Sequence, residues 1–208
     1  MAVRAVIFDF GGVLYRTPDI RWMKKVQNLL GLQHDPLINS LISSPNESPF
    51  VMDIMLGNIP ETHVWEIATQ RWKIQPALLH TIRRSLMSPR RLNHELAELL
   101  ACLRGKYRTA ILSNAGSDAR RTFTEIFKLH HAAEVMVISA EEGLAKPDLR
   151  IYERTVERLG VPAEECVFVD DFIENVEAAR AFGMKAVHFQ TNAQALAELA
   201  KYIGLPCP

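Results

Sequence analysis

Residues 3–14 read VRAVIFDFGGVL, and this stretch decides how the rest of the chain is interpreted. Residues 3–8 are rich in β-branched side chains and apolar on both faces, which is typical of a strand buried in a parallel sheet. Asp9 follows the run directly, and Gly11 and Gly12 come next. An acidic residue here, with no small-residue cleavage site, argues against a signal peptide. The stretch therefore predicts a buried first strand that ends in a carboxylate.

Four more short apolar runs follow along the chain, and helical patterns separate them. The runs cover 108–112, 135–138, 166–169 and 185–189, and the helical patterns cover 93–103, 117–128, 148–159, 173–182 and 192–202. The first of these helices places its leucines on one stripe behind Asn93, the expected N-cap. Strands that alternate with helices at this spacing form right-handed βαβ units. We predict an α/β fold with a doubly wound, Rossmann-like parallel sheet.

Residues 16–90 break this alternation. They contain no convincing strand run, but helical patterns cover 19–30, about 50–57, 62–73 and 76–87. We predict a core domain of residues 1–15 and 91–208 and an inserted all-α helical cap of residues 16–90. Trp65 and Trp72 lie seven residues apart on one face of a predicted helix. We expect them to fill the core of the insert, and a wall facing a substrate is the alternative.

The composition bounds the class of protein. The chain has 208 residues, of which 48% are hydrophobic and 23% charged, as in a soluble globular protein. Lys plus Arg and Asp plus Glu number 24 each, so no overall charge favours nucleic acid or an anionic membrane as a partner. Three widely spaced cysteines, Cys102, Cys166 and Cys207, form no zinc or redox motif, and we expect free core thiols in a cytoplasmic protein. The oligomeric state cannot be predicted.

Polar side chains follow the predicted strands, at the edge where an open α/β sheet binds its ligands. They are Asp9, Ser113, Asn114, Lys146, Asp170 and Asp171. Three carboxylates at one edge repel one another unless a cation neutralises them, and oxygen ligands of this kind suit Mg²⁺. The hydroxyl, amide and ammonium groups are donors for phosphoryl oxygens, and a helix N-terminus near Ser117 would add backbone N–H groups. A cation with oriented donors stabilises a transferring phosphoryl group, so phosphoryl chemistry with Asp9 as nucleophile is predicted.

Four segments in this order resemble the four motifs of the haloacid dehalogenase-like (HAD) hydrolase superfamily. They are DFGGVL (9–14), LSN (112–114), AKPD (145–148) and VDDFIENVEAA (169–179). The resemblance covers 1–14 and 91–192, and the insert resembles that superfamily's helical cap. The phosphatase-type branch that includes the N-terminal phosphatase domain of soluble epoxide hydrolases is the most similar. The resemblance implies Mg²⁺ as cofactor and a small phosphorylated metabolite as substrate.

The resemblance also implies roles for individual residues. Asp9 would be the nucleophile and a metal ligand, Gly11 would offer its backbone carbonyl to the metal, and Asp171 would be the second carboxylate ligand. Lys146 would act in catalysis and hold phosphoryl oxygens. The remaining roles are substrate binding by Gly12, Ser113 and Asn114, and support of Lys146 and the metal's water shell by Asp170 and Asn175.

Gly11 departs from the pattern, because most phosphatases of the superfamily carry an acid/base aspartate at this position. A positioned acid/base group contributes roughly 10²–10⁴-fold to the rate. One interpretation is a phosphatase for esters whose leaving group needs little protonation, such as anomeric sugar phosphates or acyl phosphates. A non-catalytic or very slow member that binds a ligand or partner is the second. A metal-independent 2-haloacid dehalogenase is the third, and the acid pair Asp170-Asp171 argues against it.

Overall fold

The fold is built on one parallel sheet. The computed structural model describes residues 2–16, 20–29, 31–36, 38–39, 48–73, 75, 77–78, 81, 84 and 88–204. Five strands lie in the order β3-β2-β1-β4-β5: β1 (Ala5–Phe8), β2 (Arg108–Ser113), β3 (Val135–Ile138), β4 (Cys166–Asp170) and β5 (Lys185–His188). All the paired strands run parallel. The predicted doubly wound α/β sheet is confirmed, with strand ends within two residues of the predicted runs.

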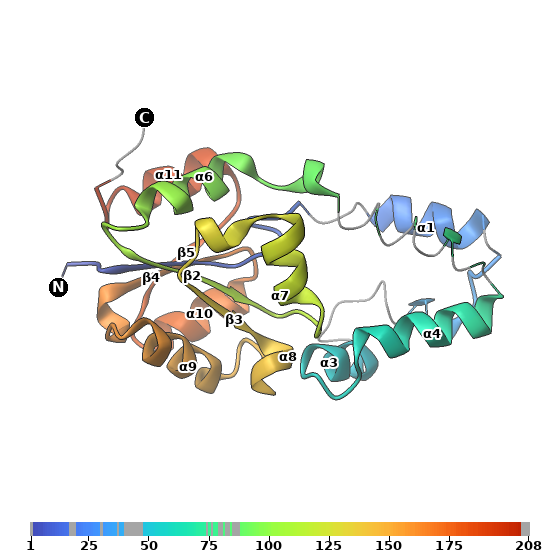
Figure 1. The fold of residues 1–208 in the computed structure, drawn as a ribbon. Helices are drawn as coiled ribbons and strands as arrows, with labels where there is room; N and C mark the ends of the chain where they lie inside the picture. The colour runs from blue at the N-terminus through green and yellow to red at the C-terminus, as the bar shows by residue number, and fades with distance from the viewer. Residues whose placement is uncertain are drawn as a thin grey trace.

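Helices cover both faces of the sheet (Figure 1). On one face α6 (His94–Leu103) and α11 (Asn192–Leu199) lie beside each other, and on the other lie α9 (Leu149–Leu159) and α10 (Ile173–Ala181). Two apolar clusters result, one on each face, and alternate β1 residues contribute to each: Val6 and Phe8 to the first, Ala5 and Ile7 to the second. Because both faces are buried, the strands contain the continuous apolar runs seen in the sequence.

Three helices begin differently in the structure from what the sequence predicts. Asn93 precedes α6, but its side chain makes no capping hydrogen bond there. Thr191, rather than Asn192, caps α11 by accepting a hydrogen bond from the backbone N–H of Gln194. The single helix predicted over 117–128 is instead α7 (Ala119–Arg121) followed by the π-helical turn η3 (Thr122–Ile126). The wider turn places Phe123 and Phe127 against Phe10 at ring-centroid distances of 4.0 and 5.3 Å, so tertiary aromatic packing accompanies the local change.

Short elements that were not predicted complete the core. They are the 3-10 turns η2 (Pro89–Arg91), η4 (Leu129–His131) and η5 (Ala163–Glu165), and the one-turn helix α8 (Ser139–Glu142). Each lies in a connection between longer elements. They are too short to give a periodic pattern in the sequence.

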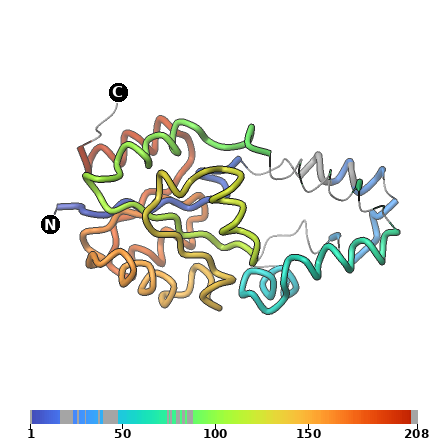
Figure 2. Tube along the Cα trace, in the orientation of Figure 1, coloured from blue at the N-terminus to red at the C-terminus, as the bar shows by residue number. Residues whose placement is uncertain are grey.

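Helices α1 (Ile20–Leu29), α3 (Pro49–Met55) and α4 (Glu61–Trp72) lie beyond the carboxyl end of the sheet (Figures 1 and 2). The described part of 16–90 contains no strand, and most of the helix predicted over 76–87 lies outside the described residues. Where the chain leaves and rejoins the sheet, the backbone N–H of Arg16 donates to the carbonyl of Arg91, and that of Asn93 to Leu14. The two crossing segments are thus joined by hydrogen bonds, and the division into a core of 1–15 and 91–208 and a cap of 16–90 stays a prediction.

The insert contacts the rim of the sheet through the start of α4. The backbone N–H of Glu61 donates to Ser117 Oγ at 3.2 Å, and the Glu61 carboxylate accepts from the N–H of Asp118 at 3.3 Å. Each segment therefore caps the other. Gly57 also packs closely on the core, because a Cβ there would lie 2.3 Å from the carbonyl oxygen of Ala140.

Trp65 and Trp72 are both half-buried, while the buried residues of α4 are Val64 and Ala68. Trp65 also lines a groove of about 330 Å³ along one face of α4. Neither the core role nor the substrate-wall role of the two tryptophans is decided by these positions, and both stay predictions.

The cysteine prediction is only partly right. Cys166 is a buried free thiol, as expected. Cys102 is exposed and disulfide-bonded, so the expectation of a free core thiol is wrong for it. Cys207 lies outside the described residues. Across the part of the chain that the structure describes, no helix is long and apolar enough to cross a bilayer.

Asn93 is buried and joins three parts of the core. Its Nδ2 donates to the carbonyl of Val13 at 3.0 Å and to Asn192 Oδ1 at 2.8 Å, and Asn192 Nδ2 donates back to Asn93 Oδ1. We expect Asn93→Ala to lower the free energy of unfolding by about 1–3 kcal/mol, because a buried acceptor and an amide lose their partner. Urea unfolding measures it. The matched control Asn58→Ala, at an exposed amide on the insert, should change stability by less than about 1 kcal/mol, and an equal loss in both variants would contradict the prediction.

Candidate active site

Three carboxylates meet at the carboxyl end of the sheet. Oxygen atoms of Asp9, Asp170 and Asp171 all lie within 4.8 Å of one another. The register explains this, because Phe8 pairs with Val169 across the adjacent parallel strands β1 and β4. Asp9 follows Phe8 and Asp170 follows Val169, so both carboxylates reach the same edge of the sheet. Asp9 is 6% exposed and Asp170 is fully buried.

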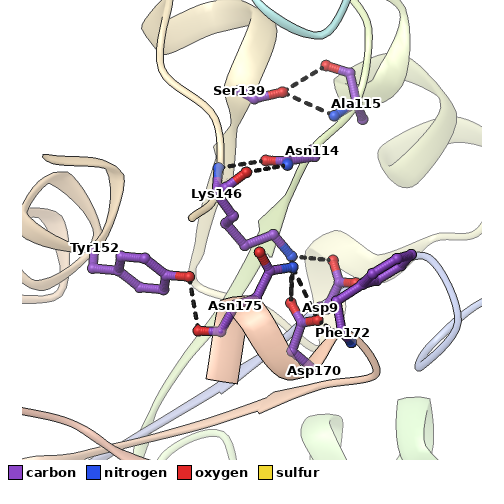
Figure 3. A network of polar contacts seen from close by, with 9 residues as sticks. All are labelled: Asp9, Asn114, Ala115, Ser139, Lys146, Tyr152, Asp170, Phe172 and Asn175. Atoms are coloured by element: carbon purple, nitrogen blue, oxygen red, sulfur yellow. Dashed lines mark hydrogen bonds and ion pairs between the residues drawn. The ribbon is translucent and has the colours of Figure 1, made fainter. Parts of the chain in front are cut away.

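Lys146 lies between two of these carboxylates. Its Nζ is 2.8 Å from Asp9 Oδ1 and 2.6 Å from Asp170 Oδ2 (Figure 3). Burial alone would lower the pKa of Lys146, but Asp9 and Asp170 outweigh it and the pKa is raised. The ammonium group is therefore held charged.

Asn114 fixes the backbone that carries this lysine. Its Oδ1 accepts from the N–H of Lys146 at 2.8 Å, and its Nδ2 donates to the carbonyl of Lys146 at 2.9 Å (Figure 3). The two hydrogen bonds connect the end of β2 to the loop after β3. Asn114 thus positions Lys146 in addition to any contact with substrate.

Asp170 is saturated with hydrogen bonds. Besides Lys146, it accepts from the backbone N–H of Phe172 at 2.8 Å and from Nδ2 of Asn175, 3.1 Å from each carboxylate oxygen. Tyr152 donates from its hydroxyl to the carbonyl of Asn175 at 2.9 Å (Figure 3). Buried charged groups are tolerated only with such partners, and the supporting role of Asn175 stays a prediction.

Asp171 has the opposite environment. Its Oδ1 is buried and has no hydrogen-bond partner among the described residues. Burial and the charge of Asp170 raise the pKa of Asp171 to about 6. Burial, reinforced by Asp170 and Asp171, likewise raises the pKa of Asp9 despite the opposing effect of Lys146. A divalent cation would give this unpartnered oxygen a partner and would bind the other two carboxylates as well. The cluster is therefore compatible with Mg²⁺.

The two glycines after Asp9 differ in what surrounds them. Gly12 has a φ of +77°, and a Cβ there would lie 2.0 Å from Asp171 Oδ2, so only glycine permits this approach. A Cβ at Gly11 would meet nothing within 4 Å. The turn is closed by the N–H of Gly12 donating to the carbonyl of Tyr15 at 2.8 Å.

The remaining predicted donors have different outcomes. Ser113 is the last residue of β2 and is buried, and within the described chain its hydroxyl makes no hydrogen bond with the carboxylates. The helix N-terminus near Ser117 was expected to bind phosphoryl oxygens, and this interpretation is not supported. Helix α7 has only three residues, and Glu61 already accepts from the Asp118 N–H.

Some residues near the site were not predicted. His188 Nε2 lies 3.1 Å from the carbonyl oxygen of Asp171, and the strand-end rule that found Asp9 would have found it at the end of β5. Tyr152 is buried on α9, where the helical period marks it only as a core position. Ser139 Oγ accepts from the N–H of Ala115, a contact with no local sequence signal.

Known proteins are similar to this chain in sequence. A family model described as haloacid dehalogenase-like hydrolase matches residues 3–183. The chain is 27% identical to the sesquiterpene phosphatase astK of Aspergillus oryzae, over 97% of each chain. It is 28% identical to bifunctional epoxide hydrolase 2 of Rattus norvegicus, over 100% of this chain and 40% of that protein.

A solved structure agrees in fold. The HAD family enzyme BT-2542 of Bacteroides thetaiotaomicron, a variant in complex with magnesium and inorganic phosphate, superposes with a TM-score of 0.73 at 18% identity, covering 92% of this chain and 96% of that one. The family match spans all four motifs and the residues that form the carboxylate cluster. The chain therefore belongs to the haloacid dehalogenase-like hydrolases.

Proposed function

We propose that this hydrolase is a magnesium-dependent phosphatase of small phosphorylated metabolites, with Asp9 as nucleophile. The observation that carries the proposal is the buried Asp9–Lys146–Asp170 arrangement beside the unpartnered oxygen of Asp171. Both alternatives stay open to test: a ligand-binding member with little or no catalysis, and a metal-independent haloacid dehalogenase. A cytoplasmic location likewise stays a prediction.

The proposed reaction has two displacements at phosphorus. A carboxylate oxygen of Asp9 forms a bond to phosphorus while the bond to the ester oxygen breaks, which leaves an aspartyl-phosphate and an alkoxide that takes up a proton. Water then attacks phosphorus and gives up a proton while the bond between phosphorus and the Asp9 oxygen breaks, which restores the Asp9 carboxylate and releases inorganic phosphate. Lys146 holds one Asp9 oxygen in place, so the other is directed to the substrate.

Asp9, Asp171 and the backbone carbonyl of Gly11 are the groups proposed to hold Mg²⁺. The bound cation would neutralise negative charge on the phosphoryl oxygens and on the clustered carboxylates. Ser113, Gly12 and Lys146 are proposed to hold phosphoryl oxygens, because they surround the same edge. The positive charge of Lys146 stabilises the charge that develops there.

The relatives support this choice of reaction. AstK bears the name sesquiterpene phosphatase, and the structure of BT-2542 contains magnesium and inorganic phosphate. We propose the same reaction class for this chain, and the residues of the four motifs are the reason. Identities of 27% and 18% do not carry the substrate across, so the substrate must be found by assay.

Replacing the nucleophile tests the proposal directly. We expect Asp9→Asn to lower Mg²⁺-dependent hydrolysis of p-nitrophenyl phosphate by about 10³-fold or more, because the amide cannot form the acyl phosphate. The matched control Glu153→Gln, which changes an exposed carboxylate on α9, should retain wild-type activity. Equal, slow phosphate release by wild type and Asp9→Asn across a metabolite panel would favour the binding protein. Halide release from 2-chloropropionate without metal would favour the dehalogenase.

Metal binding has a readout that does not depend on activity. Mg²⁺ should raise the melting temperature of the wild type, by the equivalent of about 2.7 kcal/mol when its concentration is 100 times the Kd. Asp171→Asn should lose most of this rise and, without metal, be at least as stable as the wild type, because one of the repelling carboxylates is gone. Differential scanning calorimetry with and without Mg²⁺ measures both effects. The same Mg²⁺ response in both proteins would remove Asp171 from the metal site.

Gly11 is the position at which to restore an acid/base group. The space around it admits a side chain, so Gly11→Asp should fold normally. We expect this variant to hydrolyse ordinary alkyl phosphates about 10²-fold faster or more. Its rate on anomeric or acyl phosphates should rise much less. Gly11→Asn is the matched control, because it has the same shape and transfers no proton. Equal or lower rates on both substrate classes would refute the leaving-group argument.

A further inference from the structure

We propose that the ring of Phe172 is the surface on which the organic group of the substrate packs, so that the enzyme selects phosphate monoesters with an apolar group next to the phosphate. This inference rests on the proposed function and assigns a specificity-determining residue to the same site. Phe172 does not take part in bond making.

The backbone of Phe172 is fixed to the carboxylate cluster. Its N–H donates to Asp170 Oδ1 at 2.8 Å, and Phe172 forms the N-cap position of α10 (Figure 3). The hydrogen bond places the residue directly beside the cluster. The backbone that carries the ring therefore cannot move without disturbing Asp170.

Phe172 is partly exposed to solvent. Phe172 is 48% exposed and Ile173 is 39% exposed, whereas Phe8 and Phe168 on the neighbouring strands are fully buried. An aromatic ring at the mouth of a polar site gains free energy when a ligand covers it. The rim beside Asp170 and Asp171 thus presents apolar surface, although the interior of the site is charged.

The interior has room only for the reacting group. Asp9, Lys146 and Ser113 are each at most 6% exposed, so the part of a substrate that they contact is the phosphoryl group. The ester group must then lie outside this buried set, along the rim. Gly11 and Gly12 present no side chain to the rim, whereas Phe172 brings a large, partly exposed side chain whose backbone is hydrogen-bonded to Asp170.

The substrate class follows from these surfaces. An alkyl or aryl group attached to the phosphate ester oxygen would cover the Phe172 ring, while a small acyl group or a strongly hydrated polyol would not. Hexyl phosphate and acetyl phosphate are suitable probes, because both offer a transferable phosphoryl group and only hexyl phosphate has a long apolar chain.

The experiment compares kcat/KM for the two probes in the wild type, Phe172→Ala and Phe172→Leu. We expect Phe172→Ala to lower the ratio of hexyl to acetyl phosphate about 10-fold, mainly through KM for hexyl phosphate, because one apolar contact is lost. Phe172→Leu should restore most of the ratio. Ile126→Ala, which shortens an exposed apolar residue on η3, is the matched control and should leave the ratio unchanged.

Two results would overturn the inference. One is an equal loss on both probes, which would mean that Phe172 acts only through Asp170. The other is no change in the ratio. The proposed function fails separately, if wild type and Asp9→Asn release phosphate equally from both probes. In that case calorimetry of hexyl phosphate and inorganic phosphate still tests Phe172, since only hexyl phosphate should bind more weakly to Phe172→Ala.

Discussion

The pairing of one buried ammonium with two buried carboxylates is the constraint on which the site depends. Taking charged groups out of water costs several kcal/mol per ion, and attraction offsets this only when geometry and hydrogen bonding are good. Lys146 meets the condition because Asn114 holds its backbone and Asp170 accepts from Asn175 and Phe172. Elements that are far apart in sequence are therefore fixed together: the ends of β1, β2 and β4 and the loop after β3. Removing the lysine would leave two carboxylates facing each other without compensation.

The charges at this edge do not balance. Three carboxylates share one ammonium group, and Lys146 contacts Asp9 and Asp170 but not Asp171 within the described structure. Burial, together with the charge of Asp170, raises the pKa of Asp171 to about 6. Gly12 adds to the crowding, because its missing side chain lets the backbone approach the Asp171 carboxylate. Such an arrangement reduces stability when no ligand is bound, and functional sites commonly accept this cost because a ligand removes it.

The sequence predicts the sheet and most of the site because both follow from local patterns. Buried parallel strands have continuous apolar runs, and their carboxyl ends meet at one edge, so the amino-acid order alone places Asp9, Asp170 and Asp171 together. Interactions between distant segments have no such signal. Asn93 bonds Val13 and Asn192 in place of the cap expected of it, and aromatic packing on Phe10 accompanies a π-helical turn that replaces an ordinary helix. The orphaned oxygen of Asp171 also appears only when the burial of each atom is known.

In the proposed phosphatase reaction, Gly11 and Phe172 together set what the substrate must supply. A Cβ at Gly11 would meet no atom within 4 Å, so packing does not exclude an acid/base side chain, and the position is simply open. With no carboxylic acid there, the leaving oxygen must either be a weak base or receive its proton from another source. In the proposed binding mode, the ester group lies along the rim, where Phe172 offers an apolar surface. Rate and selectivity then depend on different properties of one substrate: the acidity of its leaving group and the apolar area that it carries. An ester with both an acidic leaving group and a large apolar area would be the best substrate. An alkyl ester with a poor leaving group would bind well and react slowly.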